Sequence, residues 1–306
     1  MRHVVLVGHR GRDFAPGAHD LDAKRPGTTV ELLIYVFVAL AMLCIGMSAT
    51  LGEMLALLRD GTRITRVIVA NIVIPPVVAL GLVSLLPMND AATSVLLLLA
   101  FASGGINAVQ FSTKSPGQLA AAGELLFLLS AIGLVAAPVA AGLLLPSDAT
   151  ISFPLDELTF RVAALIAAPL GIGMGVRACA PEIAEKIYKP VMLGSTLAFI
   201  ASVLLSMSVR QDALSGLGTG TAVAMLAFVL ILMATGWFFG GPEAEHRQIL
   251  ATSTNLRNVG LVYVLVDGCC NNPLFSTAVL AFMAIMVPPN LALTVACALW
   301  RKRQVG

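Results

Sequence analysis

The chain has 306 residues, of which 58% are hydrophobic and 12% are charged, about half the charged fraction of an average soluble domain. With a mean hydropathy of +0.91, it has too little polar surface to cover its apolar residues in water, which excludes an ordinary soluble protein. A net charge of +2, without a basic run interleaved with aromatic residues, argues against nucleic acid as a partner. We therefore expect the surplus apolar surface to face a lipid bilayer.

In chain order, residues 1–29 are polar and lack the apolar core of a signal peptide, so they are expected to form a tail ahead of a membrane domain at 30–300. A spanning helix needs roughly 20 apolar residues to cross the hydrocarbon. Seven long windows without Asp, Glu, Lys or Arg and two shorter apolar stretches predict about nine transmembrane helices and an all-α, polytopic membrane protein. The expected helices are 32–52, 67–86, 93–112, 118–145, 160–177, 190–209, 217–239, 248–266 and 273–299.

Basic residues are distributed unevenly between the two sets of loops. The loops after the first, third, fifth and seventh helices, together with the carboxyl tail, hold eleven Lys and Arg, whereas the opposite loops hold two. By the positive-inside rule, the carboxyl terminus is expected in the cytoplasm and the protein in the cell (inner) membrane. The five basic residues of the amino-terminal tail would then lie outside, and we give the loops more weight.

Two of the expected helices are interrupted by glycine and polar residues, which weaken a helix in its middle. The interruptions are Ser103-Gly104-Gly105-Ile106-Asn107-Ala108-Val109-Gln110 in 93–112 and Thr252-Ser253-Thr254-Asn255-Leu256-Arg257-Asn258-Val259-Gly260 in 248–266. Each lies in the third helix of a set of four, the first to fourth and the sixth to ninth helices. Because the two sets are offset by five helices, an odd number, the second set crosses the membrane in the opposite orientation. Such a pair indicates a secondary transporter with its binding site between inverted repeats, although small residues also allow close helix packing.

Several motifs together resemble the bile acid:sodium symporter superfamily, over about residues 32 to 300. The first helix ends in a Gly-Met turn, Gly46-Met47, and the third contains the glycine pair Gly104-Gly105. A Lys/Gly hairpin, Lys114 to Gly117, precedes the fourth helix, and the eighth contains the Arg-Asn element Arg257-Asn258-Val259-Gly260-Leu261. The resemblance implies a nine-helix version of a ten-helix fold, with the first, fifth and sixth helices as a panel and the other six as a core. It also implies transport of organic anions, from small keto acids to amphipathic sterol acids.

The positions that bind sodium in coupled members of that family are largely replaced here. An ungapped reading places Ala108 and Val109 where those members have Ser-Asn, and Ser253 where they have a Glu that serves both sodium sites. Without that carboxylate, a sodium ion would depend on neutral oxygens, for which Ser253 and Asn107 are the candidate ligands. These departures argue against strict sodium dependence and leave sodium or a proton as the coupling ion; no other cofactor is expected.

Apart from Arg161 and Arg177 at the ends of 160–177, two charged residues fall within expected helices, Glu124 in the fourth and Arg257 in the eighth. A charge at the membrane centre costs about 2.5–3.5 kcal/mol on insertion scales, so both are expected to face protein or water. We hypothesise that Arg257 stands where a bound cation sits in coupled relatives, with Glu124 as its charge partner or a proton carrier. In the competing interpretation, Glu124 snorkels to the cytoplasmic face and Arg257 caps the carbonyls of the broken helix.

The expected substrate is a small organic anion, because a mid-membrane Arg and half-helix amino termini favour a carboxylate or sulfonate. Polar residues of the two breaks are its candidate contacts, although each could equally serve packing or capping: Ser103, Asn107, Gln110, Thr254, Asn255, Arg257 and Asn258. The sequence leaves the oligomeric state open.

The sequence is less compatible with two other functions, an intramembrane hydrolase and an arsenite exporter. An intramembrane hydrolase is disfavoured because all four histidines lie outside the expected helices and no Asp lies at mid-membrane depth. An arsenite exporter of the same superfamily has an Asn-Asn break that the Thr252-Ser253-Thr254-Asn255 run faintly resembles. That branch binds the metalloid through a cysteine in the first broken helix, and 93–112 contains none.

Overall fold

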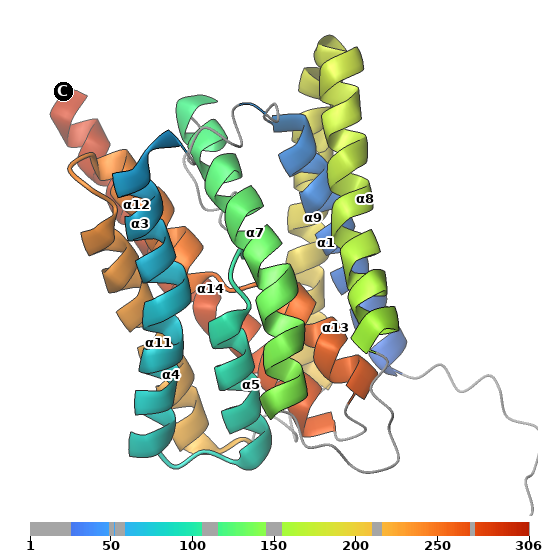
Figure 1. The fold of residues 1–306 in the computed structure, drawn as a ribbon, viewed down its shortest axis with the longest axis vertical. Coiled ribbons are helices and arrows are strands. Elements are labelled where there is room, and N and C mark those ends of the chain that lie inside the picture. Colours follow the sequence, from blue (N-terminus) through green and yellow to red (C-terminus); the bar gives the residue numbers. More distant parts are fainter. Residues whose placement is uncertain are drawn as a thin grey trace, which may run out of the picture.

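The computed structural model describes residues 26–48, 52, 59–105, 116–144, 155–209, 216–269 and 273–305. Within these ranges every regular element is helical, which confirms the predicted all-α fold (Figure 1). In chain order the elements are α1 (Pro26–Ser48), α3 (Gly61–Ile68), the π-helix η2 (Val69–Val73), α4 (Ile74–Leu85), α5 (Asp90–Phe101), α7 (Pro116–Leu144), α8 (Leu155–Cys179), α9 (Pro181–Val209), α11 (Gly218–Phe239), α12 (Ala244–Asn255), α13 (Val259–Cys269) and α14 (Pro273–Val305).

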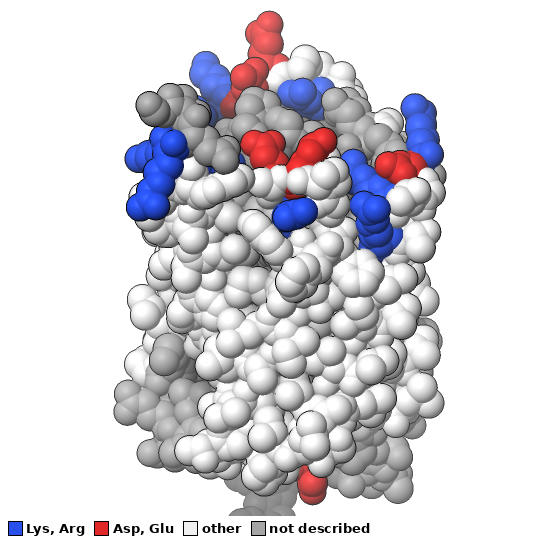
Figure 2. Space-filling model, turned by 90° about the vertical axis from the view of Figure 1, so that its left-hand side faces the viewer, with Lys and Arg blue, Asp and Glu red and all other residues white. Residues whose placement is uncertain are grey.

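Several of these helices are long and apolar enough to cross a bilayer. They are Gly61–Leu85, Pro181–Leu205, Gly218–Phe239, Ala244–Val266 and Leu274–Arg303, with shorter apolar helices at Leu32–Met47, Asp90–Phe101 and Leu128–Leu144. On the face shown in Figure 2, Lys, Arg, Asp and Glu gather at one end above a broad uncharged belt. This distribution is that of a polytopic membrane protein, because only the uncharged belt can face hydrocarbon without a large cost.

The helices form two groups that lie on opposite sides of the molecule in Figure 1. Helix α1 packs mainly against α8 and α9, while α11 packs against α12, and α14 against α13 and α5. The α1–α8 contact is close because two glycines face each other: a Cβ on Gly46 would overlap the Leu170 carbonyl, and one on Gly173 would overlap that of Leu43. Small residues at such contacts let two helix backbones approach directly.

The second interruption is present as predicted. Helix α12 ends at Asn255, α13 begins at Val259, and the segment between them is not helical. The apolar window of this broken helix is 94% buried, against 22% for that of α9. Unwound backbone at this depth therefore lies within protein and away from lipid, as its unpaired polar groups require.

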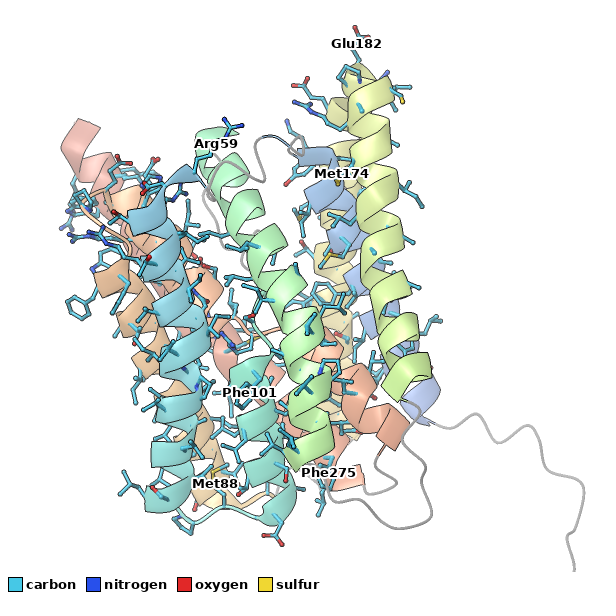
Figure 3. The ribbon with its side chains drawn as sticks, viewed as in Figure 1. Arg59, Met88, Phe101, Met174, Glu182 and Phe275 are labelled. Atoms are coloured by element: carbon cyan, nitrogen blue, oxygen red, sulfur yellow. The ribbon has the colours of Figure 1, made fainter. Side chains whose placement is uncertain are left out.

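The first interruption begins where α5 ends, at Phe101, and residues 102–105 are not helical; residues 106–115 lie outside the described ranges. Figure 3 places Met88, just before α5, at one end of the molecule and Phe101 farther in from that end. Helix α12 begins at the opposite, charged end, next to α3 (Figure 1). Each half-helix has 12 residues, about 18 Å, or little more than half of the hydrocarbon thickness. The two run in opposite directions and meet near the middle, as inverted halves require.

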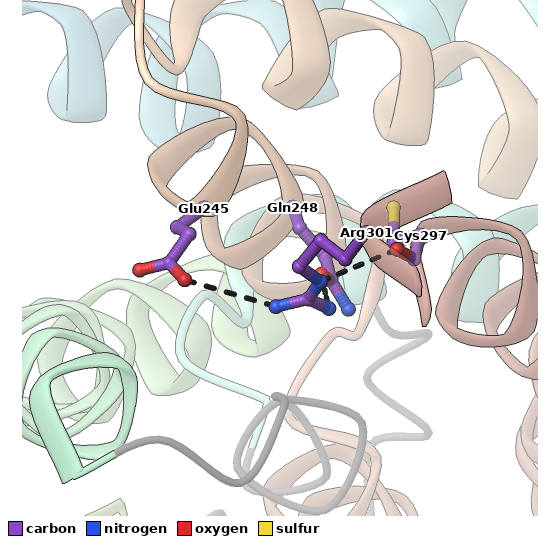
Figure 4. A network of polar contacts seen from close by, with 4 residues as sticks. All are labelled: Glu245, Gln248, Cys297 and Arg301. Atoms are coloured by element: carbon purple, nitrogen blue, oxygen red, sulfur yellow. Dashed lines mark hydrogen bonds and ion pairs between the residues drawn. The ribbon is translucent and has the colours of Figure 1, made fainter. Parts of the chain in front are cut away.

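At the charged end of the molecule, α14 contacts the first turns of α12 through Arg301. Its guanidinium donates hydrogen bonds to Gln248 Oε1 (3.0 Å) and to the Cys297 carbonyl (3.2 Å), and lies 3.8 Å from Glu245 (Figure 4). The outer turn of α12 is therefore fixed to the end of the last helix.

Candidate site where the two interrupted helices cross

The two interruptions touch through their main chains. The Asn258 N–H donates a hydrogen bond of 2.9 Å to the Ala102 carbonyl. Gly105 lies against the Leu256 carbonyl so closely that a Cβ on Gly105 would overlap its oxygen. Only glycine permits this approach, because any side chain would occupy the space of the other chain. The glycine pair noted in the sequence therefore marks the crossing point itself.

Helix α7 holds the first interruption from its other side. Ser103 Oγ donates to the Leu129 carbonyl at 2.8 Å, and Ser130 Oγ donates to that of Gly104 at 3.3 Å. Gly104 has a φ of +82°, a conformation that side chains disfavour, and a Cβ there would overlap the α7 backbone. The predicted site residue Ser103 thus anchors the interruption to α7.

Arg257 lies at the centre of the crossing, with only 1% of its surface exposed. Its guanidinium donates to four main-chain carbonyls in three helices: Leu99 (2.9 Å), Ala100 (2.7 Å), Asn71 (3.3 Å) and Thr254 (3.3 Å). A guanidinium carries five N–H donors and stays charged, so one buried side chain can serve all four. Arg257 joins α5, η2 and α12 at one point.

The sequence explains why these four carbonyls can accept from a donor outside their own helices. Leu99, Ala100 and Thr254 stand in the last turns of α5 and α12, where few N–H groups follow along the helix. Of these, the Leu99 carbonyl also accepts a hydrogen bond from the Ala102 N–H at 3.2 Å. The Asn71 carbonyl is left without a donor by Pro75 and Pro76, because the α- and π-helical partners four and five residues ahead both lack an N–H. The carboxyl ends of two helix dipoles add to the negative potential at the guanidinium.

Asn258 begins the second half of the broken helix. Its Oδ1 accepts a hydrogen bond of 3.1 Å from the Leu261 N–H, the usual amino-cap arrangement for α13. Its Nδ2 is buried and has no partner among the described residues. The amino end of α13 packs against α1, where a Cβ on Gly260 would press on the Val38 side chain.

Asn255 forms a reciprocal amide pair with Asn290 of α14. Asn255 Nδ2 donates to Asn290 Oδ1 at 3.1 Å, and Asn290 Nδ2 donates to Asn255 Oδ1 at 2.6 Å. Both amides also donate to carbonyls of their own helices, those of Ala251 and Met286 (both 2.7 Å). Both residues are fully buried, so the pair braces the end of α12 against α14.

An apolar cavity of about 160 Å³ lies beside the crossing, between α1, α7 and α8. Its lining side chains are Met42, Ile45, Leu126, Ser130, Ala131, Leu134, Ala167 and Leu170. Ser130 links it to the first interruption through the bond to Gly104. Met42 lies one turn from Val38 on α1, so the cavity is also about one helical turn from the amino end of α13.

The structure thus gathers five of the predicted site residues at the crossing: Ser103, Thr254, Asn255, Arg257 and Asn258. Asn107 and Gln110 lie outside the described residues, as does the side chain of Glu124, whose backbone is part of α7. Ser253 Oγ donates to the Ile249 carbonyl at 2.8 Å, within its own helix. Within the described ranges, no group of three or more His, Cys, Asp or Glu could hold a metal ion.

Sequence reasoning missed two residues of this site, Asn71 and Asn290. Both stand near proline doublets: Asn71 lies four residues before Pro75-Pro76, and Asn290 directly follows Pro288-Pro289. A buried Asn beside two prolines is a usable signal, because the prolines free carbonyls that polar side chains must then satisfy.

The sequence matches the SBF-like CPA transporter family over residues 19–252, more than half of the chain. The chain belongs to this family. A comparison with curated proteins found no match. Membership agrees with the resemblance to the bile acid:sodium symporter superfamily and makes the protein a multi-pass membrane transporter. The matched region ends within α12, before Arg257, so the family match does not cover the second half of the crossing.

Proposed function

We propose that this SBF-like transporter moves small organic anions by alternating access around the crossing of its two interrupted helices. The observation that carries the proposal is the meeting of the ends of α5 and α12 inside the molecule, directly beside an apolar cavity that lies between the two helix groups. Interrupted helices in inverted halves provide charged helix ends at mid-membrane depth, where a solute can bind. We assign the solute site to this cavity and to the amino end of α13.

The charge around the crossing supports an anion as the solute. Arg257 contributes a full positive charge, and the amino end of α13 contributes the positive end of a helix dipole. Because four of the five guanidinium N–H groups bind carbonyls, we propose that Arg257 attracts the anion through its field, without direct contact. The amide nitrogen of Asn258, at the amino end of α13, would then donate to the carboxylate or sulfonate.

The shape of the cavity supports a substrate with a compact apolar body. Its volume of about 160 Å³ is close to the roughly 150 Å³ of an engineered apolar cavity that binds benzene. Ser130 is the one hydroxyl among its lining residues, and the others are aliphatic side chains, alanine or methionine. A branched acyl or aromatic monocarboxylate fits this description better than a sterol acid does.

The position of Arg257 supports sodium-independent transport. A sodium ion held at the crossing would need main-chain oxygens of the half-helix ends, and the guanidinium already binds Leu99, Ala100 and Thr254 there. We therefore propose that Arg257 replaces such an ion, and that a proton is the coupling ion, with Glu124 as its candidate carrier. Ser253 and Asn107 remain the candidate ligands if sodium does bind.

We further propose that α1, α8 and α9 form the panel, against which the remaining helices move as a core. The charged end, which bears the carboxyl terminus, would face the cytoplasm of a cell (inner) membrane, because most of the Lys and Arg of the loops belong to that side.

The test is uptake of a panel of organic acids into proteoliposomes, with sodium and proton gradients imposed separately. We expect uptake of small apolar monocarboxylates that persists without sodium and follows the proton gradient. Ala131→Phe, which fills the cavity, should reduce uptake at least about tenfold. Val139→Phe is the matched control, since Val139 is an exposed residue of α7 about two turns away and does not line the cavity. Strict sodium dependence, or equal uptake by both variants, would contradict the proposal.

A further inference from the structure

Helix α14 ends in a cluster of basic residues. Arg301, Lys302 and Arg303 lie in its last turns, and no Asp or Glu follows Asp267 in the sequence. Arg301 is engaged with α12, since its guanidinium lies 3.8 Å from Glu245 (Figure 4). Lys302 and Arg303 are exposed, and within the described part of the chain neither of them forms an ion pair. The end of α14 therefore carries two positive charges that the helix itself does not balance.

The acidic side chains at the start of α12 do not balance these charges either. Glu245 is the partner of Arg301, and Glu243 lies 3.1 Å from His246 Nδ1. The start of α12 also contributes a further cation, Arg247, whose Nε donates to the Gly241 carbonyl at 2.6 Å. Four cations stand against these two carboxylates, which leaves a net charge of +2 with His246 neutral: Arg247, Arg301, Lys302 and Arg303. The ends of α12 and α14 together are therefore positively charged.

An apolar stripe leads along α14 to these basic residues. Leu291, Val295 and Leu299 follow one another at intervals of four residues, and about half of each side chain is exposed. Arg303 is the next residue in this series, so it lies on the same face of the helix as the stripe. Exposed apolar side chains of a spanning helix contact the acyl chains of the lipid. This face of α14 thus passes from hydrocarbon to a cation within one helical turn.

Both tryptophans of the chain lie beside the end of this stripe. Trp237, near the end of α11, and Trp300, near the end of α14, line one small cavity of about 20 Å³. Trp300 is 49% exposed, and Phe238, next to Trp237, is 80% exposed. Tryptophan is enriched where hydrocarbon meets the headgroups, because its ring is apolar and its N–H is polar. The two rings therefore mark the level of the headgroups, next to Lys302 and Arg303 in the chain.

Another basic segment of the charged end, at the start of α9, has a different charge balance. Lys186 and Lys189 are exposed there, but Glu182 and Glu185 precede them by four residues each. This spacing favours pairing between Glu and Lys on a helix surface, and the four charges sum to zero. The segment lies on the side of the molecule opposite the end of α14 (Figures 1 and 3). It is a matched region that has lysines without an excess of positive charge.

We propose that the ends of α11 and α14 form a binding site for an anionic phospholipid such as phosphatidylglycerol. Lys302 and Arg303 donate charge-assisted hydrogen bonds to its phosphate, and its acyl chains lie along the apolar stripe of α14 beside the tryptophans. A zwitterionic headgroup binds less well, because its quaternary ammonium brings a positive charge to a positive surface. The site lies on the outer face of α11 and α14, so it is separate from the proposed transport site and independent of the substrate.

Quenching of tryptophan fluorescence by brominated phospholipids tests the site, because both tryptophans of the chain flank it. The full-length protein is reconstituted in bilayers of phosphatidylcholine that contain brominated phosphatidylglycerol or brominated phosphatidylcholine. The ratio of the two quenching curves gives the relative binding constant of the two lipids. We expect about a tenfold preference for the anionic lipid at low salt. The preference should largely disappear at about 1 M salt, where exposed charges are screened.

Two double variants locate the charges that bind the lipid. Lys302→Gln with Arg303→Gln should lower the preference to about one. Lys186→Gln with Lys189→Gln removes the same charge from α9 and should leave the preference unchanged. All four residues are exposed, so both variants should fold, and the salt dependence of the wild type carries the test if one does not. The proposal fails if the wild type does not distinguish the two lipids, if its preference persists at high salt, or if both double variants lose the preference equally.

Discussion

The two interruptions occupy corresponding places in the two halves, yet they are built from different residues. Residues 102–105 depend on glycine, whose missing side chain lets main chain touch main chain at Leu256 and at α7. Residues 256–258 depend on Arg257, whose side chain reaches carbonyls of three helices. The first interruption and the end of α5 before it supply space and carbonyl acceptors, and the second interruption supplies the donors. Inverted halves can therefore share a geometry while their chemistry is complementary.

This difference sets what each interruption tolerates. The first interruption depends on the absence of side chains, so any added atom should disturb it. The second depends on the hydrogen bonds of Arg257, so the loss of donors should disturb it. Three sets of substitutions test the comparison, in order of decreasing expected effect.

Gly105→Ala should have the largest effect. Its Cβ would overlap the Leu256 carbonyl, which is main chain and cannot rotate away. Because neither backbone can move aside, we expect destabilisation beyond the roughly 1–3 kcal/mol of typical overpacking and beyond that of the Arg257 variants, with little folded protein by size-exclusion chromatography. Gly81→Ala is the control, because nothing lies within 4 Å of its Cβ and alanine favours the helix. Equal yields of the two variants would show that the interruptions do not touch as described.

Arg257→Gln should have the next largest effect. It removes most of the donors that bind four buried carbonyls, and breaking a buried charged network typically costs about 3–5 kcal/mol. Arg257→Lys keeps the charge but has three donors on a single nitrogen, so it should recover only part of the lost stability. Thermal unfolding in detergent measures both. If Arg257→Gln unfolds at the wild-type temperature, the guanidinium does not hold the crossing together.

Substitutions of the side chains that hold the interruptions against neighbouring helices, Asn255, Asn290 and Ser103, should give the smallest effects. We expect the effects of the Asn255 and Asn290 substitutions to be coupled to each other. Asn255→Ala and Asn290→Ala should each cost about 1–3 kcal/mol, because each leaves a buried amide without its partner. In a double-mutant cycle the double variant should cost little more than either single one. Ser103→Ala removes one neutral bond to α7 and should cost about 1 kcal/mol. Additive losses at Asn255 and Asn290 would contradict the reciprocal pair.

Much of the architecture could be predicted from the sequence. Apolar windows between charged residues give the spanning helices, because hydrocarbon imposes one length and one polarity on every crossing segment. The polar interruption at Thr252–Gly260 was located correctly, and the glycine pair marks the other interruption. The pattern also predicted the transporter class, which family membership supports.

The sequence could not supply the partners of Arg257. Its charge and depth identified it as important, but a carboxylate, a bound anion and a set of carbonyls are all reasonable partners for a buried guanidinium. The carbonyls of Leu99, Ala100 and Asn71 lie more than 150 residues away in the chain. Local pattern carries no information on which distant main-chain groups converge, and the roles of Asn71 and Asn290 stayed hidden for the same reason.

The sequence by itself thus determined that the chain lives in a membrane, where its helices lie and where two of them break, because each of these properties follows from residues that are neighbours in the chain. Only the tertiary structure decided that the two breaks meet, that Arg257 binds the ends of α5 and α12 together with η2, and that an apolar cavity lies beside this crossing. These features depend on packing between distant helices, in which an unpaired carbonyl of one helix is satisfied by a donor from another.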